Sequence, residues 1–224
     1  AGGRSGGRPG PLLDAPSVSV NLSALCPRFE VSQSARAVRE LVERLTELAL
    51  AASAARIGLT VDAEEADRLE LSLAIFADVF GDERLDDYAG LGLAVQAYQK
   101  RALRVLEWLA ALARGAGRTI PVRLVKGAYW DSEIKRAQEQ GLDDYPVFTR
   151  KCNTDVSYLA CAKALLTQHE SLYPQFATHN AHTVAWLLEV GAGRPFELQR
   201  LHGMGEELYG ELNERPGFSR RARV

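Results

Sequence analysis

The sequence predicts an α/β protein, a TIM-type (β/α)8 barrel of which about six βα units are visible. Short apolar runs of strand length alternate strictly with longer amphipathic stretches, as in parallel strands joined by crossover helices. Polar residues stand at the carboxyl end of almost every run. A barrel gathers such ends around one mouth, whereas a doubly wound open sheet, the alternative architecture, spreads them apart. We therefore favour the barrel, although a closed one needs eight units.

Six strands are predicted because each run has strand length and several are apolar nearly throughout, as expected of strands covered on both faces. In chain order they span residues 18–22, 57–62, 91–96, 121–126, 174–178 and 196–201. The polar residues at their ends are Asn21, Asp62, Gln96, Arg123 with Lys126, Thr178 with His179, and His202.

Helices are predicted between these strands, over residues 33–56, 64–80, 97–116, 131–140, 153–169, 180–191 and 205–212. In the first of them Val38, Leu41, Val42 and Leu45 recur at the spacing of one helix face. Residues 1–16 are rich in Gly, Pro and Arg and show no such periodicity, so we expect a flexible arm there. Residues 17–224 are then expected to form one barrel domain.

The composition is ordinary for a globular protein and excludes several classes. The chain has 224 residues, a net charge of −2 and 46% hydrophobic residues, with a pI of about 6.2. This balance gives no reason to expect nucleic acid as a partner, and no apolar run is long enough to span a membrane. Three cysteines without the spacing of a metal site fit a reducing compartment. We therefore expect a cytoplasmic protein.

Two strand ends carry residues suited to chemistry. Asp62 ends a strand, and the acids after it are explained by the charge of a helix amino end, which leaves Asp62 as the functional candidate. Arg123 and Lys126 place two cations, both expected to point inward, on one short strand, and Gly127 then permits close approach of the backbone. Buried cations need an anionic partner. A phosphate or an electron-rich redox ring meets that need, and a salt bridge to Asp62 or Asp131 is the structural alternative.

Three of the four histidines, His179, His182 and His202, fall in two strand-end loops. A metal-dependent enzyme is one interpretation, but no HExxH helix aligns these side chains, and we expect no metal. The chain also has no GxGxxG, Walker or GxSxG motif. A Rossmann nicotinamide site, P-loop phosphoryl transfer and esterase chemistry therefore lose their usual support.

Seven runs, in unbroken order over residues 17–213, resemble the proline dehydrogenase domain of bifunctional proline utilization A. They are LSAL at 22–25, DAEEADRLE at 62–70, QAYQKR at 96–101, RLVKGAYWDSEIKR at 123–136, YPVFTRK at 145–151, YPQFATHN at 173–180 and LHGMGE at 201–206. The resemblance implies a distorted (β/α)8 barrel that holds FAD at its mouth. It also implies oxidation of L-proline to Δ1-pyrroline-5-carboxylate by hydride transfer from proline C5 to flavin N5.

The resemblance assigns roles to individual residues. Arg123 would stabilise charge arriving on the flavin near N5, and Asp62 would lie under the flavin as the second catalytic residue. The substrate pocket would use Asn21, Asp62, Tyr129 and Leu201. The cofactor would be bound by Ala63, Gln96, Val125, Lys126, Gly127, Ala128, Trp130, Thr149, Arg150, Lys151, Thr178, His179 and Asn180.

The resemblance also implies partners. They are L-proline and proline-like small carboxylic acids, a membrane quinone as the electron acceptor, and an aldehyde dehydrogenase module in the parent protein. The domain would be cytoplasmic, with peripheral contact at the inner membrane, and would itself bind no nucleic acid.

Three departures from the family bear on function. The family has a Lys at the position of Asn21 that helps to hold the proline carboxylate, and Asn supplies no charge. The family's preceding strand is absent, and the chain stops at Val224, where a last strand and a final helix with an Arg-Arg pair are expected to begin; Arg220-Arg221 is not that pair. We therefore expect a trimmed chain, or one recorded without its outer segments. The alternative to an active enzyme is a flavin-binding barrel scaffold whose turnover is impaired because this carboxylate clamp is missing.

Overall fold

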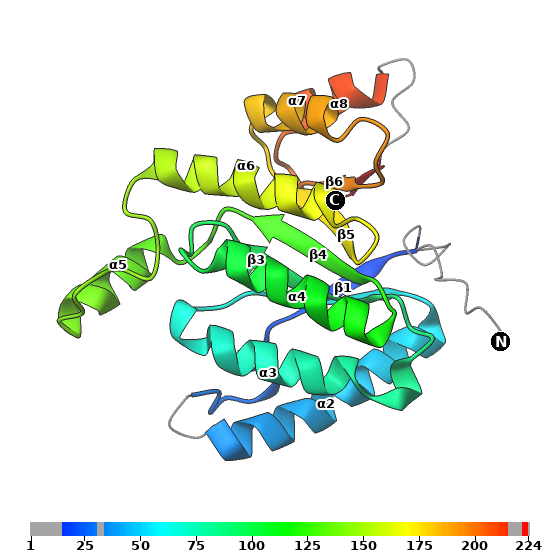
Figure 1. Ribbon diagram of the computed structural model, residues 1–224, viewed down its shortest axis with the longest axis vertical. Coiled ribbons are helices and arrows are strands. Elements are labelled where there is room, and N and C mark those ends of the chain that lie inside the picture. The colour runs from blue at the N-terminus through cyan, green and yellow to red at the C-terminus, as the bar shows by residue number, and fades with distance from the viewer. Residues whose placement is uncertain (1–14, 31–33, 215–220, 224) are drawn as a thin grey trace.

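The computed structural model describes residues 15–30, 34–214 and 221–223, and its centre is a sheet of seven parallel strands (Figure 1). In order they are β1 (Ser17–Val20), β2 (Gly58–Val61), β3 (Leu91–Gln96), β4 (Ile120–Val125), β5 (Leu172–Ala177), β6 (Glu197–Gln199) and β7 (Arg221–Arg223). Each strand pairs in parallel with the next strand along the chain. A doubly wound sheet reverses its order at a switch point, and this one does not, so the arrangement is that of a barrel.

The sheet is curled into a half-barrel. In a flat sheet β1 and β4 would lie three strand spacings apart, roughly 14 Å. Here Arg123, on β4, donates both to Ser19 Oγ on β1 and to Gln199 Oε1 on β6, each over 2.8 Å. One side chain reaches both strands only because the sheet is concave around it. In the part of the chain that the structure describes, no pairing joins β1 to β7, so these strands do not close the barrel.

Helices follow the strands, and most of them pack on the convex face of the sheet. They are α1 (Leu22–Leu25), α2 (Ser34–Ala55), α3 (Leu69–Phe80), α4 (Ala102–Ala116), α5 (Trp130–Glu139), α6 (Lys151–Thr167), α7 (Ala181–Val190) and α8 (Glu206–Glu214), with the 3₁₀ turns η3 (Ala66–Arg68) and η4 (Glu83–Leu85). Helix α2 packs against α3, and α4 packs against α6. Helix α5 projects from the edge of the molecule at which β4 ends (Figure 1).

The two faces of the sheet differ in chemistry, because alternate residues of a strand point to opposite sides. The convex face carries buried apolar side chains that join the helices in one core, including Leu59, Val61, Leu93, Val95, Val122, Leu124, Phe176 and Leu198. The concave face carries small and polar residues in register. Ser19 lies opposite Thr60, and Arg123 lies between Ala94 and Gln175. The interior of the half-barrel is therefore polar.

Several element boundaries differ from those predicted. The predicted helix over 97–116 begins at Ala102, because the preceding residues form a turn in which Gln99 N donates to Gln96 O. The predicted helix over 64–80 is divided into η3 and α3, and α1 was not predicted. Beyond the six predicted strands, Arg221–Arg223 forms β7 beside β6, close to the place where a last strand was expected to begin. Residues 1–14 of the expected arm lie outside the described residues.

Candidate active site at the carboxyl ends of the strands

Arg123 lies on the concave face, in the second half of β4, and is half-buried. Its Nη1 atom donates to Asp62 Oδ1 over 2.7 Å and to Ser19 Oγ over 2.8 Å. Its Nε atom donates to Gln199 Oε1 over 2.8 Å. The guanidinium is therefore fixed by partners from three other strands or strand ends. Among the described residues Nη2 makes no hydrogen bond, so it remains able to donate to a ligand.

Asp62 follows directly after β2, and its backbone N–H donates to Val20 O over 2.9 Å. Burial raises the pKa of Asp62 above its ordinary value, although Arg123 and the Ser19 hydroxyl act to lower it. The salt bridge between Asp62 and Arg123, which the sequence offered as the structural alternative, is formed. It is compatible with a functional role, because within the described ranges it leaves Nη2 of Arg123 without a partner.

Gln96 ends β3 and is buried. Its Nε2 atom donates to Glu64 O over 2.8 Å, and its Oε1 atom accepts from Ala128 N over 3.2 Å. The side chain therefore ties the loop after β2, which contains Ala63, to the loop after β4. The contact between Gln96 and a flavin edge stays a prediction.

Lys126 lies just beyond Val125, the last residue of β4. The expectation that it points inward together with Arg123 was wrong, because its ammonium group pairs with Asp155 on α6. Lys151 Nζ also lies 3.1 Å from Asp155 Oδ2, and the hydrogen bonds from these lysines hold the pKa of Asp155 below its ordinary value. Two cations, Lys126 and Lys151, thus share one carboxylate, so this positive corner keeps a net positive charge.

The amino end of α6 adds to this positive corner. Thr149, Arg150 and Lys151 are exposed, and Lys151 begins the helix. Within the described ranges no side chain caps this end, and its first turn contains no acidic residue. A helix amino end carries a partial positive charge and N–H groups without helical partners. Together with Lys126, it is suited to an anionic group such as a phosphate.

The loop after β4 is packed closely against its neighbours. Gly127 has φ +143°, and a Cβ there would lie 2.4 Å from Cγ of Tyr98, so the turn needs glycine. Tyr129 is half-buried, and burial raises its pKa. Trp130 Nε1 donates to Phe148 O over 2.9 Å, yet Trp130 remains 42% exposed to solvent. The loop therefore combines a rigid backbone with an accessible aromatic ring.

His179 joins the loops after β5 and β6. Its Nε2 atom accepts from Leu201 N over 3.0 Å, which puts the ring proton of a neutral His179 on Nδ1. Tyr209 OH, on α8, donates to Thr178 O over 2.7 Å. The Asn180 side chain caps α7. Leu201 itself is 64% exposed at the end of this arrangement.

Asn21 follows β1 and stands at the N-cap of α1. In the described structure its side chain makes no capping bond. Instead Ser23 N donates to Glu64 Oε2 over 3.1 Å, so the buried Glu64 caps α1 from the neighbouring loop. The amide of the half-buried Asn21 is therefore not used to hold its own helix.

The structure thus brings the predicted residues to one edge of the half-barrel, but it does not assemble the histidines. His182 and His202 are exposed. No group of three His, Cys, Asp or Glu side chains in the described ranges is placed to hold a metal ion. None of the described helices is both long and apolar enough to cross a bilayer.

Four residues of the site had no role in the sequence analysis: Ser19, Glu64, Glu133 and Gln199. The alternation of a strand indicates that Ser19 and Gln199 point to the concave face, but not that they meet Arg123. The acids after Asp62 had been assigned only to helix charge. No sequence signal distinguishes Glu133 from other helix glutamates.

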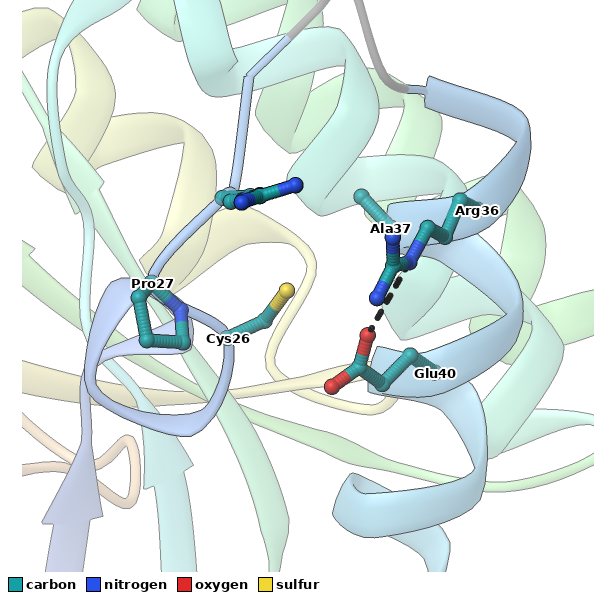
Figure 2. Close-up of a pocket in the computed structure, with 6 residues that line it drawn as sticks. Cys26, Pro27, Arg36, Ala37 and Glu40 are labelled. Carbon is teal, nitrogen blue, oxygen red and sulfur yellow. Dashed lines mark ion pairs between the residues drawn. The ribbon is translucent and has the colours of Figure 1, made fainter.

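A cavity of about 290 Å³ lies elsewhere, between the end of α1 and the start of α2. Figure 2 shows the Arg36–Glu40 ion pair on one side of it and Cys26 with Pro27 on the other. None of the residues predicted for the site lines this cavity.

Comparison with known proteins agrees with this geometry. The family model for proline dehydrogenase matches residues 4–224. The chain belongs to the proline dehydrogenase family. It is 50% identical over 205 residues to the bifunctional protein PutA of Salmonella typhimurium, covering 90% of this chain and 16% of that protein. It is 50% identical over 218 residues to PutA of Rhizobium meliloti, covering 95% of this chain and 18% of the relative.

Solved structures of the family have the same fold. A variant of Bradyrhizobium japonicum proline utilization A (PutA) superposes with a TM-score of 0.91 at 56% identity, over 94% of this chain and 22% of that one. PutA from Bdellovibrio bacteriovorus, inactivated by N-propargylglycine, gives a TM-score of 0.88 at 29% identity, over 93% of this chain and 22% of that one. The expectation of a TIM-type barrel architecture is confirmed. The chain spans less than a quarter of the length of these proteins.

Proposed function

We propose that this domain oxidises L-proline to Δ1-pyrroline-5-carboxylate with FAD as the oxidant. The observation that carries the proposal is the guanidinium of Arg123, which is held by Asp62, Ser19 and Gln199 while Nη2 has no partner among the described residues. A cation fixed before the reaction stabilises developing negative charge without reorganisation. Membership of the proline dehydrogenase family supports proline as the substrate.

The reaction is a balanced two-electron oxidation. The C5–H bond of proline breaks and its electron pair leaves with the hydrogen, the amine nitrogen releases a proton to the solvent, and a C5=N double bond forms. FAD, when bound, supplies the hydride acceptor at N5 of its ring. We place Arg123 beside that position, with Asp62 keeping the guanidinium in orientation.

The residues at the mouth fit FAD in charge and in the chemistry of their side chains. The positive corner at the amino end of α6 suits a pyrophosphate, and the accessible ring of Trp130 suits packing against a planar group. We propose as the cofactor set Ala63, Gln96, Val125, Lys126, Gly127, Ala128, Trp130, Thr149, Arg150, Lys151, Thr178, His179 and Asn180.

The proposed substrate pocket is bounded by Asn21, Asp62, Tyr129 and Leu201. The Asn21 amide can donate a hydrogen bond to a carboxylate but cannot form an ion pair with it. Neutral hydrogen bonds are weaker than charge-assisted ones. Proline and proline-like small carboxylic acids are therefore expected to bind more weakly than they would opposite a lysine.

The wider context is also part of the proposal. We propose a membrane quinone as the electron acceptor, with the domain in the cytoplasm and in peripheral contact with the inner membrane. The relatives named bifunctional PutA support a parent protein with a second dehydrogenase module, an aldehyde dehydrogenase.

An anaerobic visible spectrum, recorded before and after addition of L-proline, tests the proposal. Bleaching of the oxidised flavin band is the expected result. A flavin band that persists indicates the second candidate, a flavin-binding scaffold with impaired turnover, which the uncharged Asn21 favours. Purified protein that takes up no flavin would overturn both.

A further inference from the structure

Glu133, on α5, is a buried carboxylate to which the proposed reaction gives no role. The residue is 3% exposed, and its Oε1 atom lies 2.6 Å from the backbone nitrogen of Ala66. Glu133 belongs to the βα unit after β4, whereas Ala66 belongs to the unit after β2. The hydrogen bond therefore joins two βα units that are separated by the unit of β3.

Ala66 is the first residue of η3, and its N–H is one of those that a helix leaves without a partner. The N-cap residue, Glu65, makes no side-chain capping bond among the described residues. Glu133 thus caps η3 from another helix. The short distance is typical of an N–H donating to an ionised acceptor, while burial raises the pKa of this carboxyl group.

The segment held by this cap is the part of the candidate site that follows β2. Only four residues, 62–65, separate β2 from η3. Within them Asp62 pairs with Arg123, and Glu64 caps α1 next to Asn21. At the strand end the segment is fixed by Asp62 N, which donates to Val20 O. At the other end two side chains hold the backbone of Ala66: Glu133 accepts from its N–H, and Arg101 Nη2 donates to its carbonyl oxygen over 2.7 Å.

We propose that Glu133 is a positioning residue that holds residues 62–65 so that Asp62 meets Arg123. This inference rests on the proposed function, because it matters for catalysis only if Arg123 lies at the reacting centre. Glu133 acts through the backbone of Ala66 and touches no substrate.

A second contact between the same two elements provides a control. Arg136 Nη1, one turn further along α5, lies 2.5 Å from Asp67 Oδ2 on η3. Both of these side chains are partly exposed. Among the described residues, neither of them forms a hydrogen bond with residues 62–65. If general docking of α5 were enough, losing this ion pair would have the same effect as losing Glu133.

The test is amide hydrogen exchange in the purified chain, which needs no bound cofactor. Glu133→Gln keeps the acceptor in place, whereas Glu133→Asp keeps the charge but shortens the reach by one methylene. We expect exchange at Ala66 to be about tenfold faster in Glu133→Asp and Glu133→Ala, which corresponds to about 1.4 kcal/mol of lost protection. Glu133→Gln and Arg136→Gln should stay within about threefold of the wild type.

Unchanged exchange at Ala66 in Glu133→Asp would overturn the inference, and so would an equal increase in Arg136→Gln. Exchange in β4 is measured in the same samples, and if β4 accelerates equally the effect is global unfolding, which also overturns it. Should Glu133→Ala fail to fold, the Asp and Gln variants still decide.

With proline added, flavin reduction should be slower in Glu133→Asp and recovered in Glu133→Gln. A wild type that proline does not bleach would overturn the proposed function, while the exchange comparison would still decide the role of Glu133.

Discussion

The Nε atom of Arg123 donates to Gln199 Oε1 over 2.8 Å, although β5 lies between their two strands. Gln199 in turn donates from Nε2 to Glu197 Oε1 over 2.6 Å. The Gln199 amide thus accepts from Arg123 at Oε1 and donates to Glu197 at Nε2, so its two ends link these side chains. The orientation of the guanidinium therefore depends on the far side of the half-barrel.

We expect Gln199→Leu to slow proline-dependent flavin reduction by about tenfold, because the Nε–H group of Arg123 then loses its partner in a half-buried place. Stopped-flow absorbance under anaerobic conditions measures this rate. Gln168→Leu is the matched control, since Gln168 accepts from Arg114 at the exposed ends of α6 and α4. Rates that do not differ between the two variants would contradict the role of Gln199.

Arg123→Met should lower the rate of flavin reduction at saturating proline by about 100-fold, the loss typical of removing one preorganised charge donor. Flavin content is measured in the same sample, so that a slower reaction is not confused with lost cofactor. Arg104→Met, which removes an exposed arginine of α4, should leave the rate unchanged. An active Arg123→Met variant would remove the central element of the proposed function.

Asn21→Lys should lower the KM for proline by about tenfold, because it replaces a neutral hydrogen bond to the carboxylate by a charge-assisted one. Steady-state kinetics with an artificial electron acceptor measure the change. Asn213→Lys adds the same charge at an exposed position on α8 and should have no effect. If both variants lowered KM equally, long-range attraction rather than contact at Asn21 would be the cause.

Gly127→Ala and Gly115→Ala should change stability in opposite directions. An alanine at position 127 would meet the Tyr98 ring at 2.4 Å with φ +143°, which predicts a loss of about 1–3 kcal/mol. At position 115, within α4, a Cβ meets no described atom within 4 Å, so alanine should stabilise by about 0.5–1 kcal/mol. Urea unfolding measures both. A tolerated Gly127→Ala would contradict the tight turn after β4.

The raised pKa of Glu133 predicts a pH dependence of stability. Its ordinary value is 4.5, and burial is the main cause of the increase, so the folded state holds this proton to higher pH than the unfolded state does. The free energy of unfolding of the wild type should therefore fall, relative to Glu133→Gln, as pH rises from 4.5 through the raised pKa. Above that range the difference should be constant. Parallel stability curves for the two proteins would contradict the shift.

The sequence predicted the strands best where apolar residues continue over a full strand. The predicted span of β3 coincides with Leu91–Gln96 because this strand is buried along its whole length. The strand Arg221–Arg223 is not marked by any apolar run, since its three residues carry no apolar pattern and its place is set by pairing with β6. Local patterns describe burial, not pairing.

The same distinction applies to the site. Asp62 and Arg123 were identified because a charge at the end of an apolar strand is unusual in the sequence itself. Gln199 and Glu133 were missed because their importance arises from curvature of the sheet and from packing of α5, neither of which a run of residues encodes. The inward direction expected for Lys126 was wrong for a simpler reason. Residues three apart along a strand direction point to opposite faces, so Lys126 lies on the side of α6, where its ammonium group pairs with Asp155.

The partners of Arg123 stand 104, 61 and 76 residues away from it along the chain. Contacts between such distant residues form late, because each must first overcome the entropy of closing a long loop. A chain still emerging from the ribosome has no complete guanidinium site until Gln199 has been released. The proposed cofactor would therefore meet a complete Arg123 site only at the end of folding.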